Sequence, residues 1–250
     1  MKRLTATAVL AGAALGASAG LALGKEPSPG IDTAASALIT SKPAPAQGEQ
    51  QPLPPIGKKM GRFKLTYYWM AAETGGQRRV QLYNKRCRPV ARVSSSFARR
   101  LRLEGGGKLR DGRVLTYSGA CGCGPSLCIG IARRGHTWGT GVNGRPLSPF
   151  RSVAVDPRHV AIGTSLYIPE LDGVAMPGKA PWGGFVHDGC VVADDQGGGI
   201  RGRQLDLFAA RKFHYKALDR RHRLKRVTVF AGGERCQSLT HRPSGRPGSS

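Results

Sequence analysis

Acidic residues are scarce in this sequence: 15 Asp and Glu stand against 39 Lys and Arg, which gives a formal net charge of +24. Aromatic residues make up only 6% of the 250 residues. Beyond the start of the chain, no apolar run approaches the roughly 18 residues of a membrane helix, which excludes a multi-span membrane protein. The hydrophobic fraction of 40% is too high for a wholly disordered polycation, and 36 Gly favour turns and strands over long helices.

The start of the chain has the features of an export signal. Lys2 and Arg3 form a basic region, residues 7–23 are apolar, and residues 17–19 supply the small side chains that a signal peptidase requires. We therefore expect residues 1–19 to be a cleaved signal peptide. The protein would then be exported to the periplasm, or to the outer membrane or cell wall. The alternative is a membrane anchor. The apolar stretch is short and weakly hydrophobic, so it fits an anchor less well than a cleaved signal peptide.

All six cysteines lie after this signal. In an exported protein an even number of cysteines indicates up to three disulfides, whose pairing the sequence leaves open. The group around residues 121–128 also suggests zinc, but its spacing is not a usual zinc spacing and His136 is the only nearby histidine. We expect disulfides and no metal. The cysteines are Cys87, Cys121, Cys123, Cys128, Cys190 and Cys236.

Composition divides the rest of the chain into three parts. Residues 20–60 are rich in Pro, Ser, Ala and Gln without a repeating apolar face, which predicts a disordered linker. Residues 237–250 are polar and predict a disordered tail. We expect residues 61–236 to fold as one domain, which is long enough to bury a sizeable core.

Within residues 61–236, apolar residues occur in short runs bounded by Gly, Pro or charged residues, as is typical of strands. Residues 209–222 alone predict a helix. Short strands closed by one or two short helices predict a mainly β fold built around a small barrel. The predicted strands are residues 63–68, 114–117, 152–156, 165–168, 184–193, 204–208 and 227–230.

Three carboxylates crowd one stretch of this basic chain. Asp194 and Asp195 end an apolar strand, a turn containing residues 197–199 follows, and Asp206 lies in the next strand. Two Asp residues close together in a low-dielectric groove cannot both ionise cheaply, so one stays protonated near neutral pH, as a general acid must. The alternative is a set of exposed turn aspartates that cap backbone amides.

The same turn matches a dinucleotide-binding pattern through Gly197, Gly199 and Gly202. A strand rather than a helix is expected to follow it, and an exported protein has little use for NAD. We therefore expect no cofactor.

Several blocks of sequence together resemble the 3D domain, which is named for its three aspartates and forms the C-terminal part of MltA-type lytic murein transglycosylases. The blocks agree with that domain in order, spacing and flanking residues. They are residues 146–157 with Asp156, residues 162–168, residues 193–202 with Asp195, and residues 205–208 with Asp206.

This resemblance implies a double-psi β-barrel and an activity on peptidoglycan. The implied reaction cleaves the β-1,4 bond between N-acetylmuramic acid and N-acetylglucosamine. Asp206 would be the acid/base, and Asp195 and Asp156 the other two catalytic aspartates. The alternative function is a non-catalytic module that binds peptidoglycan.

Other polar residues are candidates for contact with the glycan. His187 precedes the Asp195 strand, although a structural hydrogen-bonded pair with Asp188 fits the sequence as well. Thr164 ends a turn, where its hydroxyl binds substrate or caps the backbone. The expected substrate-binding residues are Gly197, Gly198, Gly199, Thr164 and His187.

Basic residues concentrate in residues 201–226, mostly on the predicted helix. They form either a solvated face or a surface that attracts peptidoglycan carboxylates and anionic envelope surfaces. Nucleic acid or lipid binding is a third class of function that suits the charge. Export and the cysteine pattern argue against nucleic acid, so the expected partners are glycan strands of peptidoglycan.

Overall fold

A computed structural model describes residues 53–120, 122–123 and 127–240. The expected signal peptide, and most of the expected linker and tail, lie outside these residues. Strand β1 (Lys59–Tyr68) begins inside the predicted linker, and helix α3 (Gln237–Thr240) lies inside the predicted tail. Regular structure therefore extends past both ends of the predicted 61–236 range.

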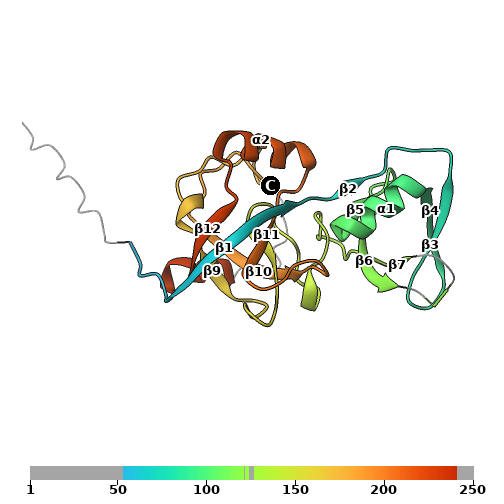
Figure 1. Ribbon diagram of the computed structural model, residues 1–250. Coiled ribbons are helices and arrows are strands. Elements are labelled where there is room, and N and C mark those ends of the chain that lie inside the picture. The colour runs from blue at the N-terminus through green and yellow to red at the C-terminus, as the bar shows by residue number, and fades with distance from the viewer. Residues whose placement is uncertain (1–52, 121, 124–126, 241–250) are drawn as a thin grey trace, which may run out of the picture. The chain divides into compact units, whose positions relative to one another are not determined.

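Six strands close into a barrel in the order β1-β11-β8-β10-β9-β12 (Figure 1). β1 pairs in parallel with β11, and β8 with β10, whereas the other neighbours are antiparallel. The mainly β fold with a small barrel that the sequence predicts is confirmed. The strands added to β1 are β8 (Ser152–Val155), β9 (Ser165–Tyr167), β10 (Cys190–Gln196), β11 (Gln204–Phe208) and β12 (Arg226–Ala231).

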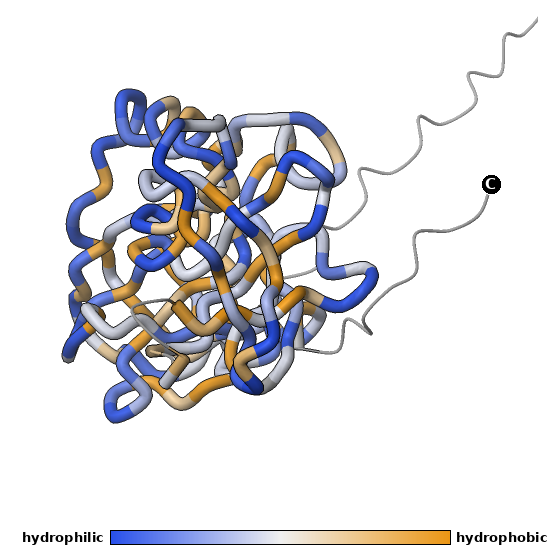
Figure 2. Tube along the Cα trace, turned by 90° about the vertical axis from the view of Figure 1, so that its right-hand side faces the viewer, coloured by the Kyte–Doolittle hydropathy of each residue, from blue (hydrophilic) through white to orange (hydrophobic). Residues whose placement is uncertain are grey.

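The barrel interior is filled by alternate residues of its strands. Phe63 and Leu65 of β1 and Leu205 and Leu207 of β11 belong to this core, and none is more than 2% exposed. In Figure 2 hydrophobic segments of the trace run through the middle of the molecule, and hydrophilic segments are frequent in the outer turns. Because side chains alternate along a strand, the residue between Leu205 and Leu207 must point away from this core.

Between β1 and β8 the chain forms a second sheet of six strands, in the order β2-β5-β6-β7-β3-β4. Leu82, Phe97 and Leu101 are fully buried in a separate cluster between this sheet and α1. The predicted domain thus contains a second hydrophobic core as well as the barrel. Its elements are β2 (Ala71–Ala72), β3 (Arg79–Tyr83), β4 (Pro89–Ser94), α1 (Ser95–Glu104), β5 (Gly106–Lys108), β6 (Val114–Ala120) and β7 (Leu127–Ile131).

Two predicted elements start later than expected. Helix α2 (Lys212–His222), drawn near the top of the barrel in Figure 1, does not include residues 209–211, because the Ala209 N–H donates to the Tyr68 carbonyl and extends the strand pairing. β10 begins at Cys190 rather than at residue 184.

Helix α1 was not predicted. The short 3-10 turns are Val142–Gly144, Pro169–Leu171 and Glu234–Cys236.

Disulfides, which the even cysteine count predicts, are confirmed. Cys87 bonds to Cys123, Cys190 bonds to Cys236, and Cys128 is also disulfide-bonded. Within the described ranges no cysteine is free, and no cluster of His, Cys, Asp and Glu is arranged to hold a metal ion. None of the helices seen in those ranges has the length and apolar character to cross a bilayer.

Candidate active site

Four residues on four neighbouring barrel strands lie in one row. Thr66 on β1 pairs with Asp206 on β11, Asp206 pairs with Ala154 on β8, and Ala154 pairs with Asp195 on β10. Directly paired residues point to the same side of a sheet, and Asp206 points away from the core, so the row lies on the outer side of the barrel. Ala154 has a small side chain, which lets the two carboxyl groups face each other across it.

The surroundings of Asp206 favour the neutral, protonated form of its carboxyl group. Burial raises the pKa of its carboxyl to about 6, although a hydrogen bond from Thr66 and the charge of Lys64 act in the opposite direction. Its Oδ1 atom is buried and has no hydrogen-bond partner among the described residues. A carboxyl group with this pKa is partly protonated near neutral pH, and the hydrogen-bonding capacity of Oδ1 is unused among the described residues.

Asp195 is half-buried like Asp206, but its carboxyl group accepts two hydrogen bonds. Burial raises the pKa of its carboxyl to about 6, against the hydrogen bond from Gln196 N–H, at 2.9 Å, and that from the Tyr68 hydroxyl, at 3.0 Å. The charges of Asp194 and Asp206 raise the pKa further. Asp195 and Asp206 therefore interact electrostatically, which disfavours the state in which both are ionised.

Asp156 lies outside this row and is 3% exposed. Its two oxygens accept hydrogen bonds from Nε and Nη2 of Arg158 at 2.9 and 2.7 Å, and Oδ2 also accepts the Gly202 N–H at 2.8 Å. The Arg158 guanidinium, followed by the Gly202 amide, holds the pKa of this carboxyl far below its usual range. Asp156 thereby anchors the turn that connects the Asp195 strand to the Asp206 strand.

The glycines of that turn differ in what surrounds them. A Cβ atom added to Gly198 or Gly199 would meet no atom within 4 Å, whereas one added to Gly197 would lie 2.8 Å from Ile200. Gly198 and Gly199 thus face open space, whereas a side chain at Gly197 would clash with Ile200. Thr164 is half-buried next to β10, where its carbonyl accepts the Ala193 N–H at 3.0 Å.

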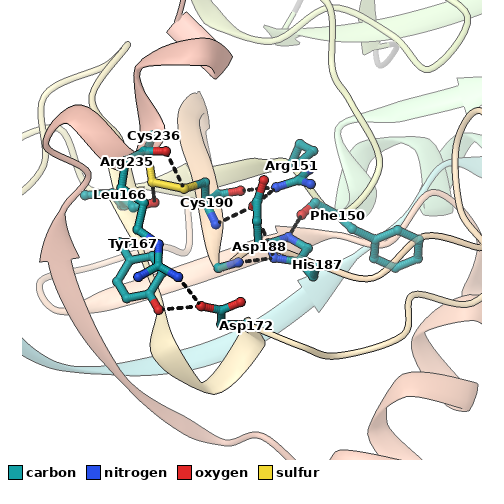
Figure 3. Close-up of polar contacts among 11 residues, drawn as sticks. Phe150, Arg151, Leu166, Tyr167, Asp172, His187, Asp188, Cys190, Arg235 and Cys236 are labelled. Carbon is teal, nitrogen blue, oxygen red and sulfur yellow. Dashed lines mark hydrogen bonds and ion pairs between the residues drawn. A yellow bond between two sulfur atoms is a disulfide. The ribbon is translucent and has the colours of Figure 1, made fainter. Parts of the chain in front are cut away.

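His187 is buried among backbone groups, as Figure 3 shows. Nε2 lies 2.7 Å from the Phe150 carbonyl, and Nδ1 accepts the Gly189 N–H at 2.9 Å. Burial, followed by the charge of Arg151, lowers the pKa of this imidazole to about 4, so it is neutral at physiological pH. Both ring nitrogens thus contact backbone groups rather than the Asp188 side chain, whose nearest oxygen lies 4.0 Å from Nδ1. His187 has a structural role here, although not as the hydrogen-bonded pair with Asp188 that the sequence suggested, and its contact with glycan stays a prediction.

Glu104, the last residue of α1, joins the carboxyl groups that the sequence singled out. Its Oε2 accepts the Trp69 N–H at 3.2 Å. Burial raises the pKa of Glu104 to about 7, and the charge of Asp206 raises it further, although the Trp69 amide and Lys212 act against this. Glu104 could not be found from the sequence, because no motif or spacing relates it to Asp206.

The family model of the 3D domain matches residues 151–219. This range contains Asp156, Asp195 and Asp206 together with strands β8 to β11. The resemblance to the 3D domain that the sequence suggested is therefore confirmed for this part of the chain.

Among solved structures, several lytic transglycosylases are similar to this chain at low identity. E. coli MltA with bound chitohexaose is 15% identical over 68% of this chain and 71% of that chain, with a TM-score of 0.47. A membrane-bound lytic murein transglycosylase from Agrobacterium tumefaciens is 12% identical over 73% and 76%, with a TM-score of 0.41. LtgG of Burkholderia pseudomallei is 16% identical over 68% and 72%, with a TM-score of 0.37. No curated protein matched the chain.

Proposed function

We propose that this protein is an exported enzyme that cleaves the β-1,4 bond between N-acetylmuramic acid and N-acetylglucosamine in peptidoglycan, as lytic transglycosylases do. The observation that carries the proposal is the Asp206 carboxyl. Its pKa is raised to about 6, its Oδ1 has no partner among the described residues, and it lies in the range matched by the 3D family model. These are the properties that a general acid for glycosidic cleavage requires.

In the proposed reaction one carboxyl group acts twice. Protonated Asp206 donates its proton to the glycosidic oxygen as the bond between that oxygen and the muramic anomeric carbon breaks. The muramic 6-hydroxyl attacks the same carbon, and the Asp206 carboxylate accepts the hydroxyl proton. The product carries a 1,6-anhydro ring, and the acid is regenerated without water. Because the nucleophile belongs to the substrate, its high effective molarity replaces a second catalytic carboxylate.

Burial favours the neutral form of Asp206, and with a pKa of about 6 its carboxyl group is partly protonated near neutral pH. The charge of Asp206 in turn raises the pKa of Asp195 and of Glu104. Tyr68 orients Asp195 through its hydroxyl. Asp156 acts through the turn that it anchors at Gly202, and we assign it a positioning role.

Glycan strands of peptidoglycan are the proposed partner. We assign glycan contact to Gly198 and Gly199, where an added side chain would meet no neighbour, and to Thr164, whose carbonyl bonds to β10. The protein acts after export, in the periplasm or at the cell wall, where its disulfides persist. Removal of residues 1–19, which contain Lys2 and Arg3 and no acidic residue, lowers the net charge from +24 to +22. This charge favours association with the carboxylates of that polymer and with anionic envelope surfaces.

The substitution Asp206→Asn tests this function. Asparagine keeps the shape of the side chain but cannot donate the proton, so the release of anhydromuropeptides from purified sacculi should fall by about 10²–10⁴-fold. Mass spectrometry of the soluble products measures both the rate and the anhydro end. Asp111→Asn is the matched control, because Asp111 is an exposed aspartate of the second sheet, and it should keep the wild-type rate.

Two outcomes would contradict the proposal in different ways. A wild-type rate from Asp206→Asn would remove Asp206 from the reaction. If the unmodified protein binds sacculi but releases no product, the non-catalytic binding module is the better description.

A further inference from the structure

A cavity borders the proposed active site, although none of the four residues of the row lines it. It has a volume of about 830 Å³, within the range of small-molecule sites, and its lining includes four arginines and two tryptophans. Asp194 is the acidic residue in its lining. The arginines in the lining are Arg133, Arg134, Arg145 and Arg151.

Two of these arginines are neutralised by the protein. Arg145 Nε donates to Asp194 Oδ1 at 2.6 Å, and Ser152 donates to the other oxygen of Asp194 at 2.7 Å. Arg151 pairs with Asp188, and it donates to the Cys190 carbonyl at 2.9 Å, as Figure 3 shows. These pairs form part of the cavity wall. Because the positive charges of Arg145 and Arg151 are largely neutralised, they attract a ligand only weakly.

Arg133 and Arg134 are not neutralised in this way. Both are exposed, and neither guanidinium has an ion pair or hydrogen bond in the described part of the chain. They lie in a tight turn of residues 133–136, in which Gly135 has a φ of 89° and the His136 N–H donates to the Arg133 carbonyl at 3.0 Å. His136 Nδ1 lies 2.8 Å from Thr140 Oγ1, which holds the turn in place. The fold thus presents two adjacent unpaired cations at the cavity.

Two tryptophans give the same cavity an aromatic surface. The rings of Trp138 and Trp182 meet edge to face, with centroids 6.3 Å apart and an interplanar angle of 81°. Trp182 is 37% exposed, so part of its ring is available for stacking against a sugar or peptide. Trp138 Nε1 is buried and has no acceptor among the described residues.

The cavity adjoins the proposed active site through two contacts. Asp194 in its lining directly precedes Asp195, and the charge of Asp194 reaches the Asp195 carboxyl. Trp138 packs against Phe208, which follows Asp206 by two residues on β11, with ring centroids 6.4 Å apart. The strand that carries Asp195 therefore also supplies part of the cavity wall, through Val192 and Asp194.

We propose that this cavity binds the carboxylates of the peptide stem attached to the glycan. Arg133 and Arg134 pair with those carboxylates, and Trp182 stacks on the adjoining part of the ligand. The inference rests on the proposed function, since it assigns the peptide-bearing part of the same substrate to a second subsite. It makes the protein selective for peptide-substituted glycan over neutral glycan of the same length.

The test compares two glycan ligands in binding titrations with the full chain carrying Asp206→Asn, so that no turnover interferes. One ligand is a peptide-bearing muropeptide, and the other is chitohexaose, which has no charge. Arg133→Gln/Arg134→Gln should weaken muropeptide binding about tenfold or more and leave chitohexaose binding unchanged. Only the muropeptide affinity should fall steeply with added salt.

The control removes the same charge elsewhere. Arg99 and Arg102 are exposed on α1 and line neither site, so Arg99→Gln/Arg102→Gln should leave both affinities unchanged. Equal losses from the two double variants would overturn the proposal in favour of a general charge effect. Equal losses for both ligands, or no loss, would overturn it too, as would no muropeptide binding by the starting protein. Tighter binding of an oligonucleotide than of the muropeptide would reassign the cavity to phosphate.

This test is separable from that of the proposed function. Affinity is measured without turnover, so failure to cleave sacculi does not alter its result. Conversely, an unchanged affinity in the Arg133→Gln/Arg134→Gln variant leaves the role of Asp206 intact.

Discussion

Asp206 and Asp156 are carboxyl groups of the same barrel, but their surroundings act on the pKa in opposite directions. Folding removes water from the Asp206 carboxyl group and gives its charged form few stabilising contacts in return, so the neutral form is favoured. Asp156 gains the Arg158 guanidinium and the Gly202 amide, so its charged form is favoured. By linkage, the two residues must affect the free energy of unfolding with opposite dependence on pH.

For Asp206, the pKa rises from 3.8 to about 6 on folding. Its stabilising contribution is therefore fully present below about pH 4 and is lost as the pH rises through 6. Asp206→Asn cannot ionise, so its stability relative to wild type should increase between pH 4 and pH 7 by about 1–3 kcal/mol. Thermal unfolding of both proteins across this range measures the difference.

Asp156→Asn should show the reverse trend. The charged Asp156 contributes stability above its ordinary pKa, and this contribution is lost only in strong acid, as the pH falls through its lowered pKa. The variant should therefore unfold at a lower temperature than wild type at pH 7, and the gap should narrow on acidification. If both substitutions changed stability in the same direction with pH, the assigned environments would be incorrect.

At the scale of elements, β10 carries a proposed active-site residue at one end and a disulfide at the other. Cys190 begins the strand and bonds to Cys236, near the last helix. Asp188 and Arg151 bind the backbone N–H and carbonyl of Cys190, as Figure 3 shows. The disulfide and these hydrogen bonds together anchor the strand from which Asp195 projects.

Removing this disulfide with Cys190→Ser/Cys236→Ser should destabilise the barrel. The bond spans a sequence separation of 46 residues, for which a loss of about 2–4 kcal/mol is expected. The amides of β10 should exchange faster with solvent. Cys87→Ser/Cys123→Ser is the matched control, with a separation of 36 residues in the second sheet. Faster exchange in β10 from that control as well would show that the two regions do not unfold independently.

At the scale of the whole molecule, the chain has separate hydrophobic clusters in the barrel and in the second sheet. Phe97 is fully buried in the second cluster, where it packs under Gly107 so closely that a Cβ added there would lie 2.8 Å from its ring. The barrel cluster includes Phe63 and the inward residues of β11. Separate cores predict separate responses to mutation.

Phe97→Ala should cost about 3–5 kcal/mol of stability in the second sheet, because it leaves a cavity in the smaller core. Hydrogen exchange should accelerate in β5, β6 and β7 and stay unchanged in β10 and β11. Phe63→Ala should give the opposite pattern. Acceleration throughout the chain from either substitution would mean that the two cores unfold as one cooperative unit.

Local sequence patterns were sufficient to predict most of the barrel strands. Runs such as residues 204–208 alternate apolar and polar side chains, and this alternation reflects burial on one side of a strand. The helix α1 was missed because its apolar residues, Phe97 and Leu101 among them, are few among arginines. Its formation depends on the Ser94 hydroxyl, which accepts the Phe97 N–H, and on packing in the second core.

The sequence by itself also determined which aspartates are unusual, because Asp195 and Asp206 flank a glycine turn in an otherwise basic chain. It did not determine that Ala154 lies between them or that Glu104 approaches Asp206. These relations depend on strand register and on contacts between residues far apart in the chain, which no local period encodes. The pairing of Arg145 with Asp194, and the freedom of Arg133 and Arg134, were likewise decided only by the tertiary structure. The sequence gives only the net charge, whereas binding depends on which charged side chains have no partner in the folded protein.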